Sequence, residues 1–143
     1  MTLEQFRERA AGEHGLVVVS TTRADGSVQS SVVNAGVMDH PRHGTPIVAL
    51  VAAGGSVKLR NLRARPWITI TVRTGWRWTT VEGSTEIAGP DDALPAVPDV
   101  PAFLREVFTA AGGTHDDWAE YDAVMARERR AAVLVTPTRV YGV

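Results

Sequence analysis

The sequence predicts a mainly β protein in which about six antiparallel strands form a small barrel, with a few short helices at its ends. Runs of β-branched and apolar residues recur at short intervals along the chain. Turn signals such as Asp25-Gly26 and Thr74-Gly75 separate neighbouring runs. The 143 residues suffice for one domain, 1–143, with a sizeable core.

The first third of the chain is predicted to hold one helix and three strands. Thr2 and Gln5 fit a capping box, which starts a helix that ends at Gly15. Strands rich in valine follow at residues 16–22, 28–37 and 47–53. Prolines and a glycine mark residues 38–46, between the second and third strands, as a loop.

The rest of the chain is predicted to alternate strands with short helices. Ser56 is a candidate N-cap for a basic helix over 57–65. Two further helical patterns span 101–113 and 115–130, after a proline-rich linker at 90–100. The remaining strands are expected at 67–73, 76–89 and 131–143, the last interrupted at Pro137.

Composition excludes several classes of protein. Fifteen Lys and Arg residues against sixteen Asp and Glu give a net charge of −1, which argues against a nucleic-acid binder. The chain has no cysteine, so no disulfide scaffold or thiol nucleophile is possible, and a reducing cytoplasm is compatible with this. No stretch approaches the ~18 apolar residues of a membrane span. We therefore expect a cytoplasmic protein without a membrane or nucleic-acid partner.

No pattern of catalytic or metal-binding residues stands out. His40 and His43 lie three apart with Pro41 between them, and a solvated loop is the expected structure there. Glu82 and Glu86 lie four apart on a strand and face the same way, but nothing else supports a two-carboxylate hydrolase. We assign no catalytic residue and no metal site.

The segment GGSVKLRNLRARP, residues 54–66, gathers positive charge in a nearly neutral chain. If its centre is helical, Lys58, Asn61 and Arg65 share one stripe, while Leu59 and Leu62 share another that can face the core. The free amides at the start of such a helix attract anions. The segment is thus either a cradle for one or two phosphates or a solvated basic helix, and the residues alone favour neither.

Four segments taken together resemble the split β-barrel flavin and deazaflavin oxidoreductases, which are related to pyridoxamine 5′-phosphate oxidase. These segments are STTRADGSVQSSVV, SVKLRNLRARPWITITV, WTTVEGSTEI and VLVTPTRVYGV. Within that family the chain is most similar to the branch that uses the deazaflavin coenzyme F420. The resemblance implies a six-stranded antiparallel FMN-binding split barrel, and a homodimer with two cofactors at the subunit interface.

The resemblance also implies a set of cofactor contacts. The family's lysine and asparagine in the helix after the third strand fall on Lys58 and Asn61, and the late basic pair Arg129-Arg130 is expected to reach across the dimer. The full set of candidate cofactor-binding residues is Gln29, Ser31, Val51, Ala52, Ser56, Lys58, Asn61, Trp78 and Arg129.

The function that the resemblance implies is hydride transfer from reduced F420 to an unsaturated small molecule, such as a quinone, an enone or a tetrapyrrole. Two alternatives remain: an FMN-dependent oxidase of the pyridoxamine 5′-phosphate oxidase type, and a non-catalytic flavin- or haem-binding module. The FMN branch places more basic residues on its strands, whereas residues 27–37 contain no Lys or Arg. Hydride transfer is the cofactor's own chemistry, so a catalytic dyad is not required.

Overall fold

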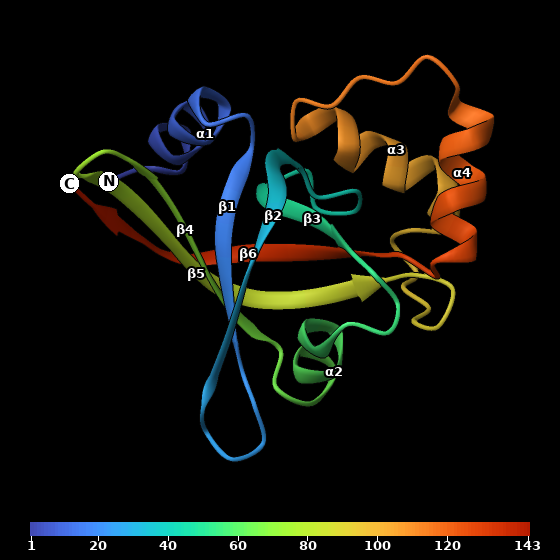
Figure 1. The fold of residues 1–143 in the computed structure, drawn as a ribbon, viewed down its shortest axis with the longest axis horizontal. Coiled ribbons are helices and arrows are strands. Elements are labelled where there is room, and N and C mark those ends of the chain that lie inside the picture. The colour runs from blue at the N-terminus through green and yellow to red at the C-terminus, as the bar shows by residue number, and fades with distance from the viewer.

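Six antiparallel strands close into a barrel in the computed structural model, which describes residues 1–143 (Figure 1). The order around the barrel is β1-β2-β3-β6-β5-β4. The strands are β1 (Leu16–Thr22), β2 (Val28–Asp39), β3 (Pro46–Ala52), β4 (Trp67–Thr74), β5 (Arg77–Ala88) and β6 (Ala131–Gly142). The predicted mainly β, six-stranded class is confirmed.

Four short helices complete the fold: α1 (Leu3–Gly12), α2 (Val57–Ala64), α3 (Val100–Ala110) and α4 (Trp118–Arg127). The capping box of Thr2 and Gln5 and the N-cap at Ser56 are present as predicted. α1 and α2 lie at opposite ends of the barrel, while α3 and α4 lie outside it (Figure 1). None of these helices has the length and apolarity that crossing a bilayer requires.

Two hydrophobic cores meet at β3 and β6. One fills the barrel, where Phe6 from α1 and Leu59 and Leu62 from α2 close its ends. The other lies between the barrel wall and the outer helices, where Phe103 and Val107 of α3 pack over apolar residues of β3 and β6. β3 is therefore buried on both faces, which explains its unbroken apolar sequence.

The second strand of the closed barrel changes its partner along its length. β2 pairs with β1 from Val28 to Asn34 but with β3 only from Ala35 to Asp39. Beyond Leu50, β3 pairs with β6 alone. The first half of β2 and the end of β3 thus separate, and we call the space between them the split.

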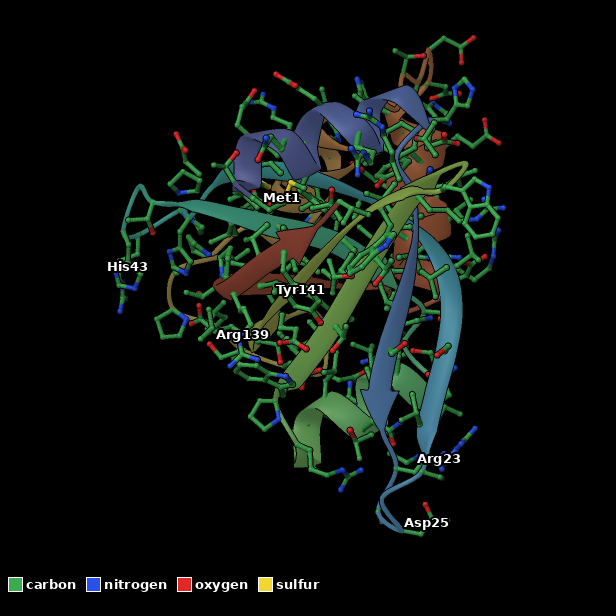
Figure 2. All side chains as sticks on the ribbon, turned by 90° about the vertical axis from the view of Figure 1, so that its left-hand side faces the viewer. Met1, Arg23, Asp25, His43, Arg139 and Tyr141 are labelled. Atoms are coloured by element: carbon green, nitrogen blue, oxygen red, sulfur yellow. The ribbon has the colours of Figure 1, made fainter.

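The outer faces of β1 and of the first half of β2 carry exposed aliphatic side chains. Val18 pairs with Val32 across the two strands, and Val32 is 64% exposed. Leu16 and Val28 are exposed on the same face. Figure 2 shows the β1–β2 hairpin extending away from the barrel to its tip at Asp25. We call Leu16, Val18, Val28 and Val32 the apolar face.

The loop after β2 corrects the expectation of a solvated loop at His40. This side chain is buried, with 3% of its surface exposed. Its Nδ1 accepts the backbone N–H groups of Arg42 and His43, at 3.1 and 3.2 Å. Nε2 therefore carries the proton and donates to Glu86 Oε1 at 2.8 Å. The two polar interactions explain how a histidine can be buried here.

Several predicted boundaries also change. β6 continues through Pro137, because the register shifts between Glu82 and Gly83 on the neighbouring strand. α4 begins at Trp118 rather than at residue 115 and ends at Arg127. Arg129 takes a left-handed conformation, with φ of 50°, which redirects the chain into β6.

Candidate functional site

A groove of about 370 Å³ lies at the split, between β2 and β3 on one side and α3 and α4 on the other. Its walls are mostly apolar, and their polar members are Asn34, Tyr121 and Arg130. Asn34 Nδ2 donates to the His14 carbonyl at 3.0 Å, and the Tyr121 hydroxyl donates to the Leu104 carbonyl at 3.1 Å. Both groups are thus held by the protein's own backbone. The apolar lining consists of Val32, Val33, Val51, Val107, Phe108, Ala111 and Met125.

The chain segments that carry Lys58 and Arg130 touch each other beside this groove. Gly54, in the loop before α2, donates its N–H to the Glu128 carbonyl at 3.1 Å. A Cβ on Gly54 would lie 2.5 Å from the Arg129 carbonyl oxygen, so only glycine allows this approach. The contact joins the start of α2 to the turn before β6.

Lys58 and Arg130 form a pair of like charges at this contact. Burial lowers the pKa of Lys58, and the positive charge of Arg130 lowers it further. Arg130 Nε donates to Glu128 Oε2 at 2.6 Å, and no other protein group bonds to its guanidinium. Arg130 lines the apolar groove and Lys58 lies near Arg130, and two neighbouring cations suit the binding of an anion.

Within one chain, Arg129 pairs with a carboxylate, and its expected contact across a dimer stays a prediction. Its guanidinium makes two hydrogen bonds to the carboxylate of Asp91. Arg63 is engaged in the same way by Asp92, at 2.7 and 2.9 Å. Arg130, the neighbour of Arg129, is the residue that joins Lys58.

Asn61 and Gln29 belong to a network that fixes α2 on the β1–β2 hairpin. Asn61 is buried, and its Nδ2 donates to Thr21 Oγ1 at 3.0 Å. The Thr21 hydroxyl in turn donates to Gln29 Oε1 at 3.3 Å. Arg65, at the end of α2, donates to the Thr22 carbonyl at 2.7 Å. These bonds position the helix that carries Lys58.

Ser31 lies on the part of β2 that has no β3 partner. It pairs with Val19 of β1, and its Oγ is buried without any hydrogen-bond partner. A buried hydroxyl without a partner is costly and rare in native proteins. Ser31 itself does not line the groove, although the next residue along β2, Val32, does.

The other candidates from the sequence are dispersed. Val51 lines the groove, and Ala52 is buried in the barrel core. Ser56 accepts the Leu59 N–H as the N-cap of α2. Trp78 lies at the far end of the barrel, where it pairs with Arg73 and contacts Tyr141 edge-on, so it is outside the groove of its own chain.

Sequence reasoning missed most of the wall formed by α3 and α4. Tyr121 and Met125, both on α4, line the groove. Glu82 and Glu86 do not form a carboxylate pair, because Glu82 accepts the Tyr141 hydroxyl and Glu86 pairs with His40. Burial raises the pKa of Tyr121, which keeps it a neutral hydrogen-bond donor.

Comparison with solved structures identifies the fold, although no family model matches the sequence. A conserved hypothetical protein from Mycobacterium tuberculosis superposes with a TM-score of 0.71 at 18% identity, over 99% of this chain and 84% of that one. An F420 reductase gives a TM-score of 0.61 at 20% identity, over 88% of both chains. A pyridoxamine 5′-phosphate oxidase-related, FMN-binding protein from Nostoc punctiforme gives 0.64 at 12% identity, over 96% and 78%. The chain has the split-barrel fold of these proteins.

The split barrel carries more than one cofactor among these neighbours. Haem-binding proteins, including one from Mycobacterium smegmatis, share the fold as well. The fold expected from the resemblance is thus confirmed. At these identities the comparison shows the fold and not a cofactor of this chain.

Proposed function

We propose that the protein is an oxidoreductase that transfers a hydride from reduced coenzyme F420 to an unsaturated small molecule. The observation that carries the proposal is an apolar groove in the split whose wall includes Arg130, with Lys58 near enough for the charge of Arg130 to lower its pKa. An apolar groove suits a planar ring system, and the two cations suit the anionic tail attached to it.

Individual residues have separate roles in holding the coenzyme. Lys58 and Arg130 bind its phosphate, and Val33, Val51 and Phe108 supply apolar surface for the ring. Ser31 offers a hydroxyl to the polar edge of the ring. When bound, the reduced deazaflavin supplies a hydride donor carbon. The chain holds that carbon close to the acceptor and excludes water, which is the contribution that proximity makes to rate.

A second copy of the chain is the expected partner. The apolar face on β1 and β2 has no helix over it, and exposed aliphatic patches mark association surfaces. Val32 belongs both to this face and to the groove lining. A homodimer built on the apolar face would therefore border the cofactor, and residues remote from the groove in one chain, such as Trp78, become available to the partner's site. We propose the cytoplasm as the compartment, with which a chain without cysteine is compatible.

An FMN-dependent oxidase is the second candidate, supported by the FMN-binding neighbour. β2 contains no Lys or Arg, so the strand beside the split adds no positive charge for a terminal phosphate. This observation favours F420 over FMN.

Enzymatic oxidation of reduced F420 tests the proposal. Purified protein is mixed with reduced F420 and a naphthoquinone or a cyclic enone, and the return of the oxidised deazaflavin absorbance is followed. We expect turnover that depends on protein and acceptor, with a raised KM for F420 in Arg130→Ala. Tight binding of haem or FMN without any oxidation of reduced F420 would refute the assignment.

A further inference from the structure

Each of three arginines near α2 is paired with one carboxylate. Arg63 pairs with Asp92 and Arg129 with Asp91, on a turn outside the groove. The third pair is Arg130 and Glu128. Of the three arginines, Arg130 alone lines the groove. Glu128 is thus the carboxylate most directly linked to the anion-binding cations.

Two bonds fix Glu128 in this place. It is the C-cap of α4, and its carbonyl accepts the Gly54 N–H from the loop before α2. Its carboxylate holds Arg130 Nε at 2.6 Å. We call Lys58, Arg130 and Glu128 the anion subsite. It contains two positive charges, on Lys58 and Arg130, and one negative charge beside them, on Glu128. Its net charge is one positive unit.

A net single charge has a consequence for the ligand. Attraction to the site grows in proportion to the charge of the ligand, whereas the cost of removing the ligand from water grows with the square of that charge. A doubly charged phosphate therefore loses more hydration free energy than its attraction to one net positive charge supplies. For a singly charged phosphate the attraction balances that loss.

We propose that Glu128 sets the specificity of the subsite for a singly charged phosphate, a phosphodiester, over the doubly charged phosphate of a monoester. The inference rests on the proposed function, because it concerns the phosphate of the cofactor bound in the split. A monoester has a second ionisation near pH 6 and is mostly doubly charged at neutral pH, whereas a diester has none. Glu128 touches neither the ring nor the transferred hydride and acts through charge.

The test uses one ring system in three forms: 8-hydroxy-5-deazariboflavin without phosphate, as its 5′-phosphate monoester, and as the methyl diester of that phosphate. Dissociation constants are measured by calorimetry at pH 7.5 for wild type and Glu128→Gln. Glutamine keeps an acceptor for Arg130 Nε and removes only the charge. Wild type is expected to bind the diester most tightly.

In Glu128→Gln we expect the diester to bind about threefold and the monoester about tenfold more tightly, because the gain in free energy doubles with the ligand charge. Glu128→Asp, which retains the charge, should keep the wild-type preference. Asp116→Asn makes the same charge change on an exposed side chain outside the groove, and should leave all three constants unchanged.

The outcomes separate this inference from the proposed function. Equal gains for both phosphates in Glu128→Gln, or a wild-type preference for the monoester, would overturn the role of Glu128 while leaving the site intact. Equal binding of all three forms would show that no anion subsite exists, and failure of all three to bind would remove the cofactor site itself. Either result overturns the inference together with the proposal on which it rests.

Discussion

Lys58 carries a charge that the free protein does not compensate. Burial and the nearby Arg130 both act against its protonated form. An anion bound between the two side chains reverses this situation and raises the pKa of Lys58. Binding is therefore coupled to the protonation of this single lysine.

The coupling predicts a pH dependence of cofactor affinity. The pKa of Lys58 in the free protein lies below the 10.5 of an exposed lysine, so affinity is complete below that lowered pKa and falls as the pH rises through it. Lys58→Arg stays protonated and should not show this decline. Lys58→Ala should weaken binding by about 1.5–3 kcal/mol, roughly ten- to a hundredfold, without lowering the free energy of unfolding.

Calorimetric titrations between pH 7 and pH 10 with the three proteins measure both effects. The same decline in Lys58→Arg as in wild type would assign the titration to another group. Unchanged affinity in Lys58→Ala would leave α2 as a solvated basic helix.

Replacing His40 tests how much its buried hydrogen bonds contribute to the stability of the fold. His40→Ala removes a buried side chain and leaves two backbone N–H groups and the partly exposed Glu86 carboxylate without their partner. We expect the free energy of unfolding in urea to fall by about 2–4 kcal/mol. His43→Ala, an exposed neighbour that stacks on His40, should cost less than about 1 kcal/mol. Equal losses in the two variants would contradict the structural role given to His40.

At the scale of elements, the turn between β5 and α3 clamps together the two segments that carry the cations. Gly89 and Asp92 pair across this turn. Asp92 holds Arg63 of α2, and Asp91 holds Arg129 of the turn before β6. Lys58 and Arg130 repel each other, and we expect these two side-chain ion pairs, together with the Gly54–Glu128 backbone bond, to hold their segments close.

Removing one half of the clamp without changing the net charge tests this role. In the double variant Arg129→Gln with Asp91→Asn we expect cofactor affinity to fall about three- to tenfold. The pH at which affinity declines should rise, because Lys58 is released from Arg130. Arg105→Gln with Asp122→Asn removes a comparable ion pair between α3 and α4 and should leave that pH unchanged. If both variants shift it equally, the clamp has only a general stabilising effect.

The elements themselves were largely predictable from local patterns. Strand periodicity, the Asp25-Gly26 turn and the Ser56 cap each depend on residues close in sequence. The partners of Lys58 were not predictable in this way, because Arg130 follows it by more than seventy residues and reaches it through the close approach of Gly54. Arg129 and Arg130 look equivalent in sequence, yet in the structure Arg129 bonds to Asp91 whereas Arg130 lines the groove.

For the whole molecule, the apolar face predicts a homodimer. Light scattering at micromolar concentration should report twice the 15.4 kDa of one chain. Val18→Lys with Val32→Lys should give a folded monomer with weakened cofactor binding, because charges on the apolar face oppose association. Ala123→Lys, on the exposed side of α4, should remain dimeric. A wild-type monomer would contradict both the interface and a cofactor site shared between two chains.

The most direct measurement on the cofactor is a calorimetric titration of the wild-type protein with coenzyme F420, FMN and haem in parallel. A split that binds a deazaflavin through Lys58 and Arg130 should take up F420 with a dissociation constant in the micromolar range or below and one molecule per chain. FMN should bind more weakly, because the strand beside the split adds no positive charge. Tighter binding of FMN would make the protein a flavin enzyme, and binding of haem alone would make it a haem carrier; either result would contradict the assignment to F420.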